Sequence, residues 1–327
     1  MNILLAVPKI LPVTRYGGTE RIVWWLAKEL SGLGHKVYLL SGPGSYCEFA
    51  AILPYRPDVS FNEQVPGDVD VVHLHFEPAE TPEKPYLITV HGNPVTSKVF
   101  DINTVFLSKD HAFRHHSNTY VYNGIDPEEY GVADLVSDRS YLHFLAKAAW
   151  RLKNLRGAIS ISRKSGYPLK VLGGHRINIK MGLRITLDPR IRFYGMVSGY
   201  KKNRLINGSK ALLFPVLWHE PFGLSVIESL YFGCPVFGTP YGSLPELVPF
   251  QVGYLSDRQS ELVRALRDIG GYSAKTCHEY VMDKFTSRRM AIDYLALYAK
   301  VLTGEKMNSS RPFYENNNGS RLLPFNK

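Results

Sequence analysis

Short apolar runs alternate with amphipathic stretches along the first part of the chain. Residues 2–7 form an apolar run typical of a buried strand, and residues 19–33 place apolar side chains near one helical face before two glycine stop signals. Strands that alternate with helices build a parallel sheet covered on both faces. Further short runs, each followed by turn residues, predict strands at 37–40, 69–75, 86–90, 105–108 and 119–122.

A second alternating series begins near Tyr141. It predicts strands at 142–145, 169–172, 191–194, 211–214 and 235–237, and helices at 155–165, 202–209, 224–232, 261–269, 274–285 and 288–302. This organisation predicts an α/β protein with two doubly wound, Rossmann-like domains facing a central cleft. We expect the domains at 1–130 and 131–285, a helix over 286–303 that crosses back to the first domain, and a loosely held polar tail over 304–327.

The composition excludes several classes of protein. The chain has 327 residues, of which 45% are hydrophobic and 21% charged, values typical of a soluble globular protein rather than a disordered chain, collagen or a coiled coil. No stretch approaches the roughly 18 apolar residues of a membrane-spanning helix, and the apolar opening stops at Pro8. Three widely spaced cysteines indicate neither a disulfide framework nor a zinc knuckle, so we expect a cytoplasmic protein.

The positive charge is concentrated in one segment. Residues 147–204 contain fifteen Lys or Arg residues and one acid, Asp188, in a chain whose formal net charge is +10. Such a surface attracts nucleic acid, an anionic membrane or a phosphorylated small molecule. The few aromatic residues of the segment do not alternate with the cations as a base-stacking surface would require. A nucleic-acid-binding protein therefore stays an alternative rather than the preferred interpretation.

The most specific group of residues lies between the predicted strand at 211–214 and the next helix. The segment 218–224 reads Trp-His-Glu-Pro-Phe-Gly-Leu and leads to Ser225 and Glu228. Counted on a helix, Glu220 and Glu228 would lie roughly 12 Å apart, and the buried Glu228 carboxylate would need donors, which ligand hydroxyls would supply. The N–H groups at the helix start predict a phosphate site at Phe222, Gly223, Leu224 and Ser225.

This segment resembles the retaining GT-B glycosyltransferases of family 4, the glycosyl transferases group 1. The family transfers a sugar from a nucleotide donor without a bound metal. The resemblance extends from residue 16 to about residue 285. It rests on Glu-Pro-Phe-Gly-Leu-x-x-x-Glu at 220–228, Tyr16-Gly17-Gly18-Thr19-Glu20, His91-Gly92, Asn123-Gly124-Ile125-Asp126, and Phe144-Leu145-Ala146-Lys147 with Lys153-Asn154.

The resemblance implies roles for the matching residues. Glu228 would bind the donor ribose, and Glu220 would hold the transferred sugar with the backbone of 222–224, while the following amides bind the diphosphate. Lys147 and Lys153 would stabilise charge on that diphosphate as the glycosidic bond breaks, although the family more often has Gly-Arg and Glu-Lys-Gly there. His91 would lie near the reacting sugar. Four further residues would contact the donor: Gly17 and Gly18 at a phosphate or the acceptor, and Met196 and Val197 at the base.

Simpler explanations exist for some of these residues. The lysines could belong to a solvated basic face, His91 could be a packing residue, and Gly17 and Gly18 could form a tight turn. Histidine pairs at 73 and 75 and at 111 and 115, with Asp68 and Asp70 nearby, leave a metal hydrolase as an alternative.

The expected partners follow from the resemblance and the charge. The donor would be a nucleotide-diphosphate sugar, with no metal or cofactor required. The acceptor would be a glycan or lipid-linked molecule of lipopolysaccharide or other cell-envelope synthesis, and no nucleic acid would bind. The basic segment predicts peripheral contact with the anionic inner face of the membrane.

Overall fold

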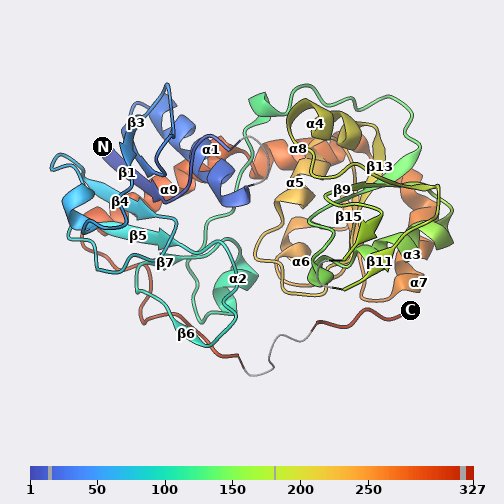
Figure 1. Ribbon diagram of the computed structural model, residues 1–327. Coiled ribbons are helices and arrows are strands. Elements are labelled where there is room, and N and C mark those ends of the chain that lie inside the picture. The colour runs from blue at the N-terminus through green and yellow to red at the C-terminus, as the bar shows by residue number, and fades with distance from the viewer. Residues whose placement is uncertain (14–16, 180–181, 317–321) are drawn as a thin grey trace. The chain divides into compact units, whose positions relative to one another are not determined.

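The computed structural model describes residues 1–13, 17–179, 182–316 and 322–327. The chain divides into two compact units. Unit 1 comprises residues 1–126 and 286–319, and unit 2 comprises residues 127–285 and 320–327. Each unit contains a six-stranded sheet in which every strand pair is parallel (Figure 1). The prediction of two Rossmann-like α/β domains is therefore confirmed.

The sheet of unit 1 has the strand order β3-β2-β1-β4-β5-β7. Residues 119–122 form no named strand, and Tyr120 makes only an isolated bridge to Phe106, because β7 ends at Val105 and Ser108 then caps a helix. The elements are β1 (Asn2–Val7), α1 (Gly18–Gly32), β2 (Lys36–Ser41), β3 (Ala51–Pro54), η1 (Asn62–Gln64), β4 (Val71–Leu74), β5 (Tyr86–Thr89), β7 (Thr104–Val105), α2 (Lys109–Phe113) and α9 (Ser287–Leu302).

Helix α9 packs against α1, β4 and β5, although it comes from the far end of the sequence (Figure 1). Its hydroxyl groups enter a buried polar network. The Tyr298 hydroxyl lies 2.8 Å from His73 Nδ1, and Thr89 Oγ1 lies 2.7 Å from His73 Nε2 and 2.9 Å from the Tyr294 hydroxyl. Both ring nitrogens of His73 are therefore hydrogen-bonded to protein hydroxyls, which removes a ligand that the metal-hydrolase alternative needs.

Residues 304–316 pack against the first part of unit 1, residues 1–126, so the prediction of a loosely held tail is wrong for these residues. Strand β16 (Phe313–Tyr314) pairs antiparallel with β6 (Lys98–Val99). The buried Asn308 amide donates to the carbonyls of Ile102 and Thr104, at 2.8 and 2.9 Å. Besides these hydrogen bonds, the segment makes scattered apolar contacts: Met307 is buried, and the Phe313 ring stacks on His116 with centroids 3.9 Å apart. These contacts have no regular spacing, so the sequence shows no hydrophobic period. Residues 317–321 lie outside the described residues.

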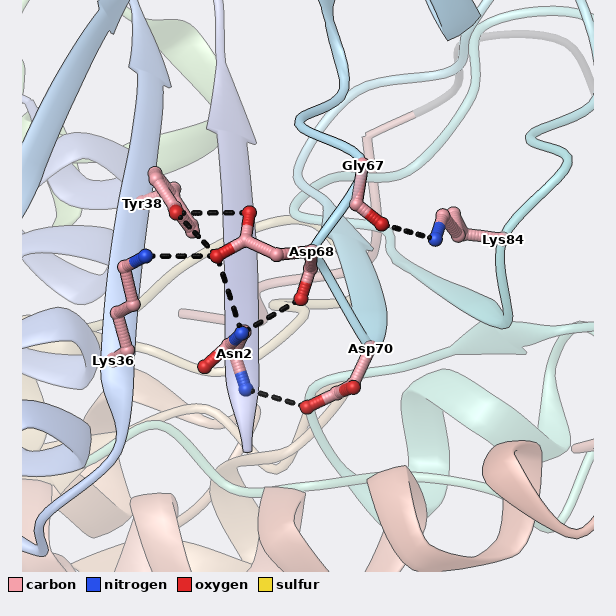
Figure 2. A network of polar contacts seen from close by, with 7 residues as sticks. All are labelled: Asn2, Lys36, Tyr38, Gly67, Asp68, Asp70 and Lys84. Carbon is pink, nitrogen blue, oxygen red and sulfur yellow. Dashed lines mark hydrogen bonds and ion pairs between the residues drawn. The ribbon is translucent and has the colours of Figure 1, made fainter.

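A polar network ties the amino ends of β1, β2 and β4 together (Figure 2). The Asp68 carboxylate accepts hydrogen bonds from Lys36 Nζ and the Tyr38 hydroxyl, both at 2.8 Å, and Asp70 accepts one from the Asn2 backbone at 2.7 Å. The hydrogen bonds from Lys36 and Tyr38 hold the pKa of Asp68 below its usual value. Asp68 and Asp70 therefore have protein donors, and they lie at the edge of the sheet opposite to the one where parallel-sheet ligands bind.

The sheet of unit 2 has the strand order β12-β9-β8-β13-β14-β15. Its elements are η2 (Pro127–Glu129), β8 (Tyr141–Leu145), η3 (Arg151–Lys153), α3 (Leu155–Ser165), β9 (Leu169–Leu172), β10 (Ile177–Asn178), β11 (Arg184–Ile185), β12 (Ile191–Phe193), α4 (Gly199–Asn207), β13 (Ser209–Phe214), α5 (Leu224–Tyr231), β14 (Val236–Gly238), α6 (Leu244–Leu247), β15 (Gly253–Leu255), α7 (Gln259–Ala265), η4 (Leu266–Gly271) and α8 (Ala274–Lys284).

A buried histidine in the core of unit 2 makes stability depend on pH. His143 on β8 bonds Ser209 Oγ and Ser229 Oγ, both at 2.8 Å, and burial lowers its pKa to about 3. The unfolded chain therefore takes up a proton below pH 6.5 that the folded chain does not, and stability falls as the pH falls towards 3.

We expect urea unfolding between pH 6.5 and 4 to show this loss, with a shallower slope in His143→Gln. The difference should approach, at most, about 1.4 kcal/mol per pH unit. Equal slopes for the two proteins would show that His143 is charged in the folded state.

Candidate active site

Loops from several strands of unit 2 meet at the carboxyl edge of its sheet. The Gly173 amide donates to the Gly195 carbonyl at 2.7 Å, and the Ala148 amide donates to the Gly173 carbonyl at 2.9 Å. On the other side of β8, the Leu217 amide donates to the Leu152 carbonyl at 2.7 Å. The loops that carry the predicted donor residues of unit 2 are thus joined at the edge where parallel sheets bind ligands.

Helix α5 begins directly behind this edge. Gly223 precedes it with φ of 98°, a left-handed conformation that glycine adopts without steric cost. Phe222 and Gly223 are buried, while Leu224 and Ser225 are half-buried at the first turn. The Ser225 hydroxyl donates to the Leu145 carbonyl at 2.7 Å, which fixes the helix start to the end of β8. The backbone N–H groups of the first turn give this end of the helix a partial positive charge.

Glu220 and Lys153 form a partly buried ion pair at this edge. Lys153 Nζ lies 2.5 Å from Glu220 Oε2, and the two side chains are 12% and 9% exposed. Trp218 Nε1 donates to the same oxygen at 2.8 Å, and the Lys153 ammonium lies 4.8 Å from the Trp218 ring centroid. Lys153 and Glu220 belong to two different predicted motifs and lie 67 positions apart in the sequence, yet their side chains are in contact.

Glu220 does not lie on the helix, so the expected helical spacing between Glu220 and Glu228 is wrong. The physical reason is the left-handed Gly223, which lets α5 begin only at Leu224. Glu220 instead forms a parallel bridge with Gly242, and its carbonyl accepts from the Ser243 amide at 2.9 Å. The loop after β14 thus supports the backbone that presents the Glu220 carboxylate. Sequence reasoning missed Gly242.

Replacing Gly242 with alanine is expected to displace Glu220. Gly242 has φ of +66°, and a Cβ there would lie 2.3 Å from the Glu220 amide nitrogen. We expect a loss of about 2 to 4 kcal/mol in the free energy of unfolding, since the clash adds to the left-handed strain. Gly131→Ala is the matched control, with φ of +72° and no atom within 4 Å of its Cβ. Urea unfolding of both variants measures the clash, and equal losses would contradict it.

Glu228 has protein donors, contrary to the expectation that ligand hydroxyls would supply them. Its Oε1 accepts from Lys202 Nζ at 2.5 Å and from the Tyr130 hydroxyl at 2.6 Å. The Lys202 and Glu228 side chains are only 6% and 8% exposed. Lys202 lies on α4 and Tyr130 follows η2, so two distant segments position this carboxylate. Neither residue was identified from the sequence.

Lys147 has a different environment from Lys153. It follows the end of β8 and is exposed, with its Nζ 5.0 Å from the Trp150 ring centroid. The structure therefore places both lysines on loops of the same sheet edge, but it brings only Lys153 into contact with Glu220. Met196 and Val197 follow Gly195 on the loop after β12, and the Met196 side chain is exposed.

The predicted residues of unit 1 lie at the carboxyl ends of its own strands. His91 follows β5, and its Nε2 lies 2.8 Å from His75 Nδ1, a pairing that the sequence did not indicate. Burial lowers the pKa of His91 to about 4, so its imidazole is neutral near pH 7. Gly17 precedes α1, which begins at Gly18, and Tyr16 lies outside the described residues. A cavity of about 270 Å³ is lined by His75, His91, Asn93, Lys98 and Asp101, among others.

Within the described ranges, no three His, Cys, Asp or Glu side chains come together as metal ligands could. None of the helices in those ranges is both long and apolar enough to cross a lipid bilayer.

Comparison with solved structures identifies the architecture. The chain is similar to AviGT4, a glycosyltransferase involved in avilamycin A biosynthesis, with a TM-score of 0.72, 23% identity, and coverage of 93% of this chain and 98% of that chain. It is similar to Anabaena HepE in complex with UDP and glucose (TM-score 0.61, 12% identity, 91% and 99% covered). It is also similar to WaaG, a glycosyltransferase involved in lipopolysaccharide biosynthesis (0.55, 15%, 92% and 98%). The fold is therefore that of the GT-B glycosyltransferases.

The sequence itself matches one family. Residues 160–270 match Glycosyl transferases group 1, a segment that includes both Glu220 and Glu228. No curated protein matches the sequence significantly. The family match and the GT-B fold together support an enzyme that transfers a sugar.

Proposed function

We propose that the protein is a retaining, metal-independent glycosyltransferase that uses a nucleotide-diphosphate sugar. The observation that carries the proposal is the contact between Lys153 and Glu220 beside the start of α5. Glu220 and α5 lie within the family-matched residues 160–270. The Lys153 ammonium, the Glu220 carboxylate and the backbone N–H groups at the start of α5 lie at the edge where a parallel sheet binds ligands. These are the groups needed to hold a diphosphate and a sugar next to each other.

In this proposal, Glu228 binds the donor ribose and Met196 and Val197 face the base. Glu220 and the backbone of 222–224 hold the transferred sugar, and the amides of Leu224 and Ser225 bind the diphosphate. Lys202 and Tyr130 orient the Glu228 carboxylate.

The bond between the anomeric carbon and the diphosphate breaks as the acceptor hydroxyl oxygen bonds to the same face of that carbon. The hydroxyl proton passes to the departing phosphate oxygen, and the products are a nucleoside diphosphate and a glycosylated acceptor. Lys147 and Lys153 stabilise the charge that develops on the leaving group.

We place the acceptor in unit 1, at the cavity beside His91. His91, Asn93, Lys98 and Asp101 offer donors and acceptors for sugar hydroxyls. We propose His91 as a neutral group near the reacting sugar, with Gly17 and Gly18 close to the donor phosphate or the acceptor. The acceptor is a glycan or lipid-linked molecule of cell-envelope or lipopolysaccharide synthesis, and the enzyme works in the cytoplasm on the inner face of the membrane. The similarity to WaaG supports this choice of pathway.

Thermal unfolding in the presence of UDP, GDP, ADP and CMP, with and without EDTA, tests the donor site without knowledge of the acceptor. A ligand at about 100 times its dissociation constant stabilises the folded state by about 2.7 kcal/mol. We expect stabilisation by one nucleoside diphosphate, unchanged by EDTA. The anomeric configuration of the product, read by NMR, tests retention. No shift with any nucleotide, beside a shift with DNA or zinc, would reject the proposal in favour of the nucleic-acid or metal alternative.

A further inference from the structure

A small β-ribbon in unit 2 exposes an apolar face. Strands β10 and β11 pair antiparallel, with Ile177 opposite Ile185 and Asn178 opposite Arg184. Because side chains alternate along a strand, Ile177 and Ile185 lie on one face of the ribbon and Asn178 and Arg184 on the other. Three further aliphatic residues, Ile179, Leu183 and Leu187, flank the strands and are also exposed. The exposed fractions are 63% for Ile177, 78% for Ile179, 62% for Leu183, 57% for Ile185 and 84% for Leu187.

The polar face of the ribbon is fastened to the rest of unit 2. The buried Arg184 donates to Thr186 Oγ1 at 2.9 Å and to the His175 carbonyl at 2.8 Å, and its guanidinium lies 5.0 Å from the Phe193 ring centroid. Arg156 on α3 donates to the Leu183 carbonyl at 2.7 Å. Sheets with one solvated face usually bury their apolar side chains and expose their polar ones. This ribbon does the reverse, so its apolar face is available to a partner.

Cations lie next to the ribbon. A cavity of about 280 Å³ beside the ribbon is lined by Arg151, Arg156 and Arg184, together with Asn154, Asn178 and others. Asp188, the single acid between residues 147 and 204, is already ion-paired with Arg163 at 3.0 Å and Arg190 at 3.5 Å. The apolar face therefore lies in a region of positive potential, and a partner must offer both apolar volume and negative charge.

We propose that the ribbon docks this protein on an anionic phospholipid bilayer. The five aliphatic side chains enter the boundary between headgroups and acyl chains, and Arg151 and Arg156 contact lipid phosphates. A standard protein–protein interface needs about 800 Å² and 20 to 30 residues on each partner, which is more than five aliphatic side chains and the neighbouring arginines provide. A bilayer with anionic lipids matches both the apolar face and the charge. The inference deepens the proposed function, because it names the surface that brings a lipid-linked acceptor to the enzyme.

Sedimentation with lipid vesicles tests the proposal directly. We expect the chain to bind phosphatidylcholine vesicles that contain about 30 mol % phosphatidylglycerol far better than phosphatidylcholine alone, with binding that weakens as salt increases. Ile177→Ser/Ile185→Ser should weaken binding at least about tenfold, because two aliphatic side chains no longer leave water. Arg151→Gln/Arg156→Gln should weaken it about fivefold for each arginine and reduce its dependence on salt.

Val132→Ser/Val136→Ser is the matched control. These two valines also belong to unit 2 and are 92% and 93% exposed, but Asp134 lies between them in the sequence and Asp138 follows two residues after Val136. The control should bind vesicles as the wild type does. Equal thermal unfolding midpoints of all variants would show that weaker binding does not reflect unfolding.

Four results would overturn the inference. They are equal binding to both vesicle types, no binding to either, full binding by the isoleucine variant, and a wild-type dimer that this variant converts to a monomer. The last result would make a second copy of the chain the occupant. Nucleotide-induced stabilisation of the same samples separates the two proposals. Stabilisation by a nucleotide without vesicle binding rejects only the docking surface. Vesicle binding without stabilisation by a nucleotide rejects only the donor site.

Discussion

Replacing Lys153 with alanine is expected to lower the rate of donor cleavage by about 10²- to 10³-fold. The Lys153 ammonium is the cation in contact with Glu220, at 2.5 Å, and we propose that it stabilises the departing diphosphate. An interaction that strengthens only as the bond breaks affects kcat more than KM. Both constants can be measured from donor hydrolysis in the absence of acceptor, with the released nucleoside diphosphate as the readout.

Lys164→Ala is the matched control for this variant. Lys164 also belongs to unit 2, on α3, but its Nζ donates to Gln259 Oε1 at 2.8 Å rather than to a residue of the site. Its rate of donor hydrolysis should equal that of the wild type. Lys153→Arg should recover part of the lost rate, since it restores the charge with a different geometry. A wild-type kcat in Lys153→Ala would remove Lys153 from the catalytic residues.

Replacing Glu228 with alanine should abolish donor binding and lower the free energy of unfolding by about 3 to 5 kcal/mol. The variant loses the carboxylate proposed for the ribose, and it leaves the buried Lys202 ammonium without its ion-pair partner. Removing one member of a buried pair costs far more than removing both. Urea unfolding and calorimetric titration with the nucleoside diphosphate measure the two effects separately.

The double variant Lys202→Met/Glu228→Ala separates the structural role from the binding role. It removes both charges, so we expect it to recover most of the lost stability while donor binding stays absent. It also keeps the experiment decisive if Glu228→Ala alone does not fold. Recovery of donor binding together with stability would show that Glu228 supports the fold of unit 2 and does not contact the donor.

Elements with local signals could be predicted closely from the sequence. Helix α3 has the bounds expected for it, because the Asn154 side chain accepts from the Gly157 amide at its start and Gly166, with φ of +82°, ends it. The start of α5 after Gly223 is encoded in the same local way. Such caps involve neighbours in the sequence, so the residue types alone reveal them.

Contacts between distant segments could not be predicted. Lys202 looked like one more cation of the basic segment, yet it is buried against Glu228 on another helix. His75 looked like half of a metal-binding pair, but its ring lies against His91 from the next strand. Residues 177–187 show a clear alternation of aliphatic and other residues in the sequence, and the ordinary expectation is that the aliphatic residues of strands β10 and β11 point inwards. Only the buried hydrogen bonds of Arg184 show that the polar side is the inner one.

The division of unit 1 between the two ends of the chain has a consequence for synthesis. The ribosome synthesises residues 1–126 and then all of residues 127–285 before it synthesises α9. Until that moment His73 and Thr89 lack the tyrosine hydroxyls that hydrogen-bond them in the finished protein. The strands of the unit 1 sheet are therefore synthesised first, but the helix that packs on them is synthesised after the whole sheet of unit 2. A nascent chain that stalls after residue 285 carries the whole six-stranded sheet of unit 2 and the helices of that unit, whereas the sheet of unit 1 still lacks α9.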